Sequence, residues 1–71
     1  MEQKYLELMQ RDYPEELEPN GMYPAFLADF KYVEKHPEKW REYPTWVRQM
    51  YEQNPEAAVL KYTYETLESF A

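Results

Sequence analysis

The sequence contains no cysteine, one glycine and one histidine in 71 residues. Without cysteine, neither a disulfide framework nor a thiolate metal site can form. A single glycine cannot supply a glycine-rich phosphate loop or a dinucleotide-binding turn. The only serine, Ser69, is near the end of the sequence and the only histidine, His36, directly precedes a proline, so no nucleophile can be paired with a base. With only Glu34 and Glu38 beside it, His36 is also a poor zinc ligand set, and we expect no enzymatic activity, cofactor or metal.

The sequence also lacks a long hydrophobic run. No apolar stretch is long enough to span a bilayer. The first residues do not show the basic and then apolar layout of a signal peptide. We therefore expect a cytoplasmic protein that does not contact a membrane.

Positive charge is scarce, because the net charge is −6 with 14 acidic and 8 basic residues. A nonspecific nucleic-acid binder needs a basic surface, so we expect no direct binding of nucleic acid. The acidic residues gather in the run from Asp12 to Glu18, whereas basic residues are most frequent from Lys31 to Arg48. Basic and aromatic side chains alternate around Trp40 and could stack on bases, but interspersed glutamates favour a solvated surface around this tryptophan.

Aromatic residues, in contrast, are abundant: the chain has two Trp, eight Tyr and three Phe. A domain of this size buries only about 60% of its unfolded surface, and its core supplies roughly 3–5 kcal/mol. Each aromatic side chain buries about 150–250 Å², and tyrosine is frequent where one side is apolar and the other is wet. Stability therefore has to come from tight packing of large side chains or from a partner.

The clearest local pattern runs from Tyr43 to Tyr51. Pro44 suits the first turn of a helix, and the apolar residues that follow it repeat at a spacing of four, which places them on one helical face. This pattern predicts a helix over Pro44–Gln53, ended by Asn54-Pro55. A similar Tyr-Pro start predicts a helix over Pro24–Lys35; two short copies do not decide whether the resemblance reflects a duplication.

Two further helices are expected, over Glu2–Asp12 and Pro55–Phe70. Asn54 is a good N-cap and Pro55 a good first residue for the last helix. Its apolar arc is broad, so this helix is either central to the bundle or shared with a partner. A strand over residues 57–64 is the less favoured alternative, because the alternation is poor and no second strand is available to pair with it.

The connectors are rich in proline. The connector over residues 13–23 has the turn signal Asn20-Gly21, and prolines recur every five residues along and directly after it, at Pro14, Pro19 and Pro24. We expect one helical turn over Pro14–Leu17, a positive φ at Gly21, and a short helix or turn over Pro37–Glu42. The predicted fold is an all-α, single-domain bundle of about four short helices spanning residues 1–71, with a proline-rich connector between the first two.

The function that this composition favours is a small, acidic, non-catalytic protein–protein interaction module. We expect an inhibitor or adaptor, of the kind that phages and mobile elements direct at host proteins, that binds a protein partner through an aromatic face. The expected contact residues are Trp40, Tyr43, Trp46, Tyr51 and Tyr64, with Glu15, Glu16 and Glu18 as a charged rim.

Two alternatives stay open. In the first, the carboxylates imitate phosphates and the chain inhibits a nucleic-acid-processing enzyme as a nucleic-acid mimic. In the second, the chain is a structural subunit that forms a homo-oligomer through its broad apolar arc. The bundle needs some of the aromatic residues for its core, and the sequence does not sort core from contact residues.

Overall fold

The computed structural model describes residues 4–70 and confirms an all-α bundle. It contains four α-helices and two 3-10 helices: α1 (Lys4–Asp12), η1 (Pro14–Leu17), α2 (Met22–Lys35), η2 (Pro37–Glu42), α3 (Thr45–Gln53) and α4 (Pro55–Phe70). No strand occurs within these residues, so the strand alternative for residues 57–64 is wrong. The expected beginning of the first helix, at Glu2, lies outside the described residues. No helix within residues 4–70 is both long enough and apolar enough to cross a membrane.

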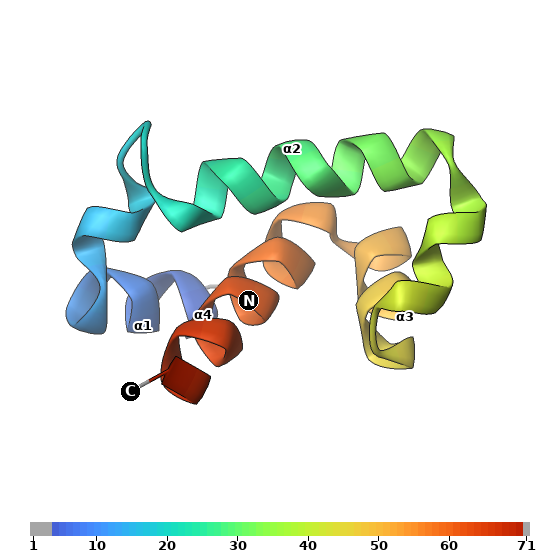
Figure 1. Ribbon diagram of the computed structural model, residues 1–71. Coiled ribbons are helices and arrows are strands. Elements are labelled where there is room, and N and C mark those ends of the chain that lie inside the picture. Colours follow the sequence, from blue (N-terminus) through green and yellow to red (C-terminus); the bar gives the residue numbers. More distant parts are fainter. Residues whose placement is uncertain (1–3, 71) are drawn as a thin grey trace.

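Helix α4 is the central element of the bundle. It packs against α1, α2 and α3, and no other two of the four α-helices are in comparable contact. Figure 1 shows α2 along one side of the molecule, with α1 and η1 at one end and η2 and α3 at the other. The molecule measures 33 × 26 × 20 Å. The broad apolar arc of α4 is therefore accounted for by contacts inside the chain.

Small side chains allow α4 to occupy this position. Its first two turns bury Ala57, Ala58, Val59 and Leu60, and the two alanines let neighbouring helices approach closely. Thr63 is also fully buried, and its hydroxyl donates a hydrogen bond of 2.7 Å to the carbonyl of Val59. This bond satisfies the hydroxyl within the helix, so its burial leaves no unpaired polar group.

The aromatic core is centred on Phe30 of α2, which is completely buried. Four rings surround it at centroid distances of 5.0 to 6.1 Å, all of them tilted or edge-on: Trp40, Tyr43, Tyr51 and Tyr62. Aromatic pairs prefer such arrangements over face-to-face stacking. Because these rings come from η2, from the residue that follows it, from α3 and from α4, Phe30 joins all of these segments to α2.

The helix ends follow local chemistry. The side-chain oxygen of Asn54 accepts a hydrogen bond of 3.3 Å from the N–H of Ala57, which confirms the predicted N-cap of α4. Helix α3 begins at Thr45, one residue later than predicted, because Pro44 has extended backbone angles and takes the N-cap position. Helix α2 begins at Met22, two residues earlier than predicted, where the Glu16 carboxylate accepts the Met22 N–H at 2.8 Å.

The prediction of a positive φ at Gly21 is wrong. Gly21 has φ −87° and ψ −178°, an extended conformation that any residue adopts. A Cβ atom at this position would collide with the backbone carbonyl of Glu16. The glycine is required by the close approach of η1 to the start of α2.

Candidate functional site

The residues that sequence reasoning examined for catalysis are placed apart. The His36 Nδ1 lies 3.0 Å from the Tyr32 carbonyl oxygen, and its ring stacks on the Tyr32 ring at 4.1 Å. Ser69 lies in the last turn of α4. No group of three or more His, Asp or Glu side chains within residues 4–70 is arranged to hold a metal ion.

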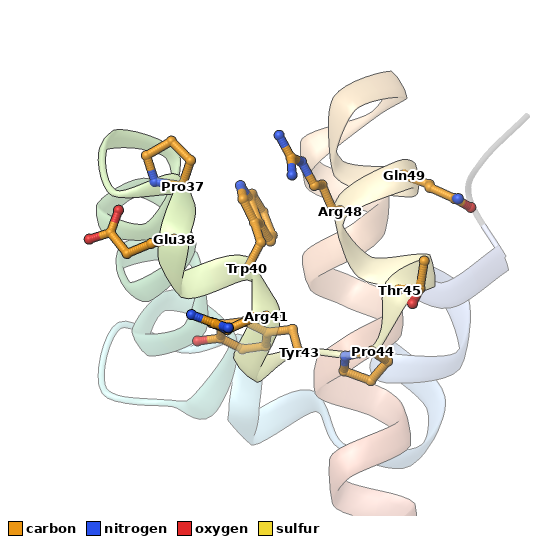
Figure 2. Close-up of a pocket in the computed structure, with 9 residues that line it drawn as sticks. All are labelled: Pro37, Glu38, Trp40, Arg41, Tyr43, Pro44, Thr45, Arg48 and Gln49. Atoms are coloured by element: carbon orange, nitrogen blue, oxygen red, sulfur yellow. The ribbon is translucent and has the colours of Figure 1, made fainter.

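An open groove of about 510 Å³ lies between η2 and α3. Figure 2 shows its nine lining residues: Pro37, Glu38, Trp40, Arg41, Tyr43, Pro44, Thr45, Arg48 and Gln49. We refer to it as the Trp40 groove. It exists because Pro44, in extended conformation, separates η2 from α3, so the two short helices diverge instead of continuing as one.

Trp40 forms the aromatic wall of this groove. Its ring packs 5.4 Å from Tyr51 and 6.1 Å from Phe30, so one side of the indole belongs to the core. The other side projects between η2 and α3, towards the side chain of Arg48 (Figure 2). The indole N–H forms no hydrogen bond with residues 4–70, and it is not a buried unsatisfied group, so this donor is open to solvent.

A second hollow of about 370 Å³ adjoins the Trp40 groove. The two hollows share Pro37, Trp40 and Arg48. The second continues past Tyr51 towards the start of α4 at Pro55. The hollowed surface is therefore elongated, with the Trp40 ring at its middle.

The charge of the Trp40 groove is opposite in sign to that of the whole chain. Its lining includes two arginines, Arg41 and Arg48, and one carboxylate, Glu38, whereas the chain carries a net charge of −6. The Nε of Arg48 lies 3.2 Å from a carboxylate oxygen of Glu52, in a pair that is exposed on both sides. Arg41 forms no ion pair within residues 4–70. Exposed pairs of this kind are weak, so both guanidinium groups are free to meet another anion.

Tyr43 supplies the second aromatic ring of the groove. Burial raises the pKa of its hydroxyl above the ordinary value, and the nearby Tyr62, Asp29 and Glu42 add to the shift. The hydroxyl therefore stays protonated well above neutral pH. The Tyr43 ring lies 6.3 Å from that of Trp40 and 5.0 Å from that of Phe30, which fixes its orientation.

The other predicted aromatic contacts lie elsewhere. Tyr51 is 6% exposed and belongs to the core, and its hydroxyl donates a hydrogen bond of 3.1 Å to Glu34. Trp46 lines a separate hollow of about 230 Å³ with Tyr62 and Phe70, and the Lys61 ammonium lies 4.3 Å from its ring centroid. Of the predicted aromatic residues, only Trp40 and Tyr43 line the Trp40 groove.

Tyr64 and the acidic residues lie at the other end of the molecule. The Tyr64 hydroxyl donates to Asp12 at 2.7 Å, which joins α4 to α1, and Figure 1 shows α1 and η1 far from α3. Glu15 and Glu18 are exposed at η1, whereas Glu16 is partly buried and holds the start of α2. The eight predicted contact residues therefore do not form one face.

Sequence reasoning did not find Arg48, although this residue lies opposite Trp40 in the groove. Arg48 falls on the polar face of the α3 pattern, which gave no reason to pair it with a residue of η2. The break at Pro44 was a visible signal, but the angle between η2 and α3 depends on packing against Phe30. Comparisons of the chain with protein-family models, curated proteins and solved structures find no match.

Proposed function

We propose that this chain is a small non-catalytic protein–protein interaction module, an inhibitor or adaptor, that binds its protein partner with the Trp40 groove. The observation that supports the proposal is a half-buried tryptophan, with an unpaired N–H, between two arginines in an open groove. Tryptophan, tyrosine and arginine are the side chains most enriched at the energetic centres of protein interfaces. If Trp40 served only the core, covering the exposed part of its ring would stabilise the fold further. The open groove therefore favours a second role for this residue.

The size of the molecule is consistent with this proposal. A standard interface covers about 800 Å² on each partner, which is about a sixth of the 4913 Å² of surface here. Such an area would extend beyond the Trp40 groove onto the outer faces of η2 and α3. Their exposed polar residues outside the groove, including Glu42 and Gln53, would form the rim.

The acidic end supports the mimic alternative, in which the partner is a nucleic-acid-processing enzyme. Glu15 and Glu18 are exposed there and form no ion pair with the described residues. The self-assembly alternative is supported by Phe70, an apolar side chain that is 77% exposed beside the Trp46 hollow. Each alternative uses a different part of the surface, so substitutions can separate all three.

The test is affinity capture from a nuclease-treated lysate of the source cells, with mass spectrometry of the captured proteins. The bait carrying Arg41→Glu and Arg48→Glu reverses the charge of the Trp40 groove, and Glu15→Gln with Glu18→Gln is the matched control at the other end. We expect one stoichiometric partner that the control bait retains and the groove variant loses. Loss of capture by the control bait alone would contradict the proposal in favour of the mimic. Recovery of an oligomeric bait alone would contradict it in favour of self-assembly.

A further inference from the structure

We infer that the Trp40 groove takes an extended, proline-containing segment of the partner that carries carboxylates next to its prolines. This inference rests on the proposed function and adds the chemistry of the segment that the groove receives.

The shape of the surface favours an extended segment. Adding a strand to a sheet edge is excluded within residues 4–70, which contain no strand. A docked helix needs a continuous apolar groove for side chains one turn apart, but Arg41, Arg48 and Gln49 interrupt the apolar lining here. Grooves lined by aromatic side chains instead bind polyproline II segments. The proline rings of such a segment pack flat on the aromatic faces.

The position of Trp40 fits such a segment. Its ring lies where the Trp40 groove and the second hollow meet, so residues on either side of the ring can occupy separate hollows. A polyproline II chain has no internal hydrogen bonds, and its carbonyl groups are free to accept one. The solvent-open indole N–H of Trp40 is a donor of the matching kind.

The charge of the groove selects the flanking residues. In the Trp40 groove Arg41 and Arg48 outnumber Glu38, whereas Glu34 and Glu52 line the second hollow, so the carboxylates of the segment belong in the Trp40 groove. Guanidinium groups pair with carboxylates through two parallel hydrogen bonds. Arg48 can leave Glu52 for this purpose because their pair is exposed. The net charge of −6 would repel a long acidic run, so the segment should carry one or two carboxylates close to its prolines.

Nuclear magnetic resonance of the two indole N–H groups tests this inference. The probe is a short blocked peptide in which one or two aspartates lie at one end of a proline-rich stretch, and the comparison peptides carry lysine for aspartate or alanine for proline. We expect the aspartate peptide to shift the Trp40 signal but not that of Trp46, which lies in a separate hollow and serves as an internal control. Its affinity should exceed that of the lysine peptide by about tenfold or more, because charge-assisted hydrogen bonds are lost.

Substitutions of the two arginines test the charge preference without disturbing the fold. Arg41→Gln and Arg48→Gln are exposed changes that should preserve the fold and remove the preference for aspartate over lysine. Equal or tighter binding of the lysine peptide, or no shift of Trp40 with any peptide, would overturn the inference. A single-stranded oligonucleotide that shifts Trp40 at lower concentration than the aspartate peptide would overturn it in favour of base stacking. If the peptides fail while capture of the partner still depends on Arg41 and Arg48, only the segment chemistry is wrong.

Discussion

The rings of Trp40 and Tyr51 pack 5.4 Å apart, but only one of the two side chains is enclosed. Tyr51 is 6% exposed, and its hydroxyl donates a hydrogen bond to Glu34. Trp40 is half-buried, and its indole N–H faces an open groove. Of these two contacting aromatic residues, Tyr51 belongs to the core and Trp40 belongs to the surface. Substitutions at the two positions should therefore have different consequences.

Replacing Phe30 should unfold the chain. Phe30→Ala removes the ring that four other aromatic side chains surround, and such a change costs about 3–5 kcal/mol. A domain of this size has roughly that much stability in total, so we expect mostly unfolded protein at 25 °C by circular dichroism. Phe30→Leu, which fills more of the space, should stay folded with a lower urea midpoint. An Ala variant as stable as wild type would show that Phe30 is not the centre of the core.

Replacing Gly21 by alanine distinguishes two reasons for a glycine. The backbone angles at Gly21 suit any residue, and if conformation alone mattered, alanine would stabilise the fold by about 0.4–1 kcal/mol. The collision of a Cβ with the Glu16 carbonyl predicts the opposite sign, with a loss of about 1–3 kcal/mol from overpacking. Urea denaturation of Gly21→Ala measures the sign. Asn20→Ala, at the exposed neighbouring position, is the control and should be close to neutral.

The contact between Tyr13, the residue that follows α1, and helix α4 should weaken at high pH. Tyr13 donates a hydrogen bond of 2.5 Å to Glu68, and this bond raises the pKa of the hydroxyl to about 12 from 10.0. Because the pKa is raised on folding, the stabilisation is complete below pH 10 and is lost as the pH rises through about 12. Melting temperatures of wild type and Tyr13→Phe, measured over this range, should converge as the pH rises. Curves that stay parallel would contradict the hydrogen bond.

The same end of the molecule should respond to acid through Asp12. Its carboxylate accepts hydrogen bonds from Arg11 at 2.7 and 2.9 Å and from Tyr64 at 2.7 Å, which lowers its pKa to about 2 from 3.8. Because the pKa is lowered on folding, the stabilisation is present above pH 3.8 and is lost as the pH falls through about 2.

The comparison of wild type with Asp12→Asn isolates this contribution from the other carboxylates. The difference in melting temperature should shrink as the pH falls from 4 to 2. It should also shrink with added salt, because the Arg11–Asp12 pair is exposed. A difference that is independent of pH would show that Asp12 acts through packing alone.

The parts of the fold that were predicted correctly depend on chemistry between close neighbours in sequence. The Asn54 cap, the turn at Pro14–Leu17 and the short helix at Pro37–Glu42 are all decided within a few residues. The reason for Gly21 was predicted incorrectly, because it depends on Glu16, a residue of the preceding helix.

The candidate site was predicted only in part, for a similar reason. Trp40 and Tyr51 both contact Phe30, and which of the two rings is enclosed depends on how η2 and α3 pack around it, which neither local sequence shows. Arg48 enters the groove because η2 and α3 diverge at Pro44. Helical periodicity gives the face on which a side chain lies, but not the element that this face will meet.

Site-specific photo-cross-linking tests most directly whether the Trp40 groove is the face that meets a partner. Gln49→p-benzoylphenylalanine places the reactive group on an exposed residue of the groove lining, and Glu15→p-benzoylphenylalanine places it at η1. After irradiation in the source cells, the proposed function predicts a covalent adduct with a single protein from position 49 and none from position 15. An adduct from position 15 alone would contradict it and place the contact on the acidic end of the molecule.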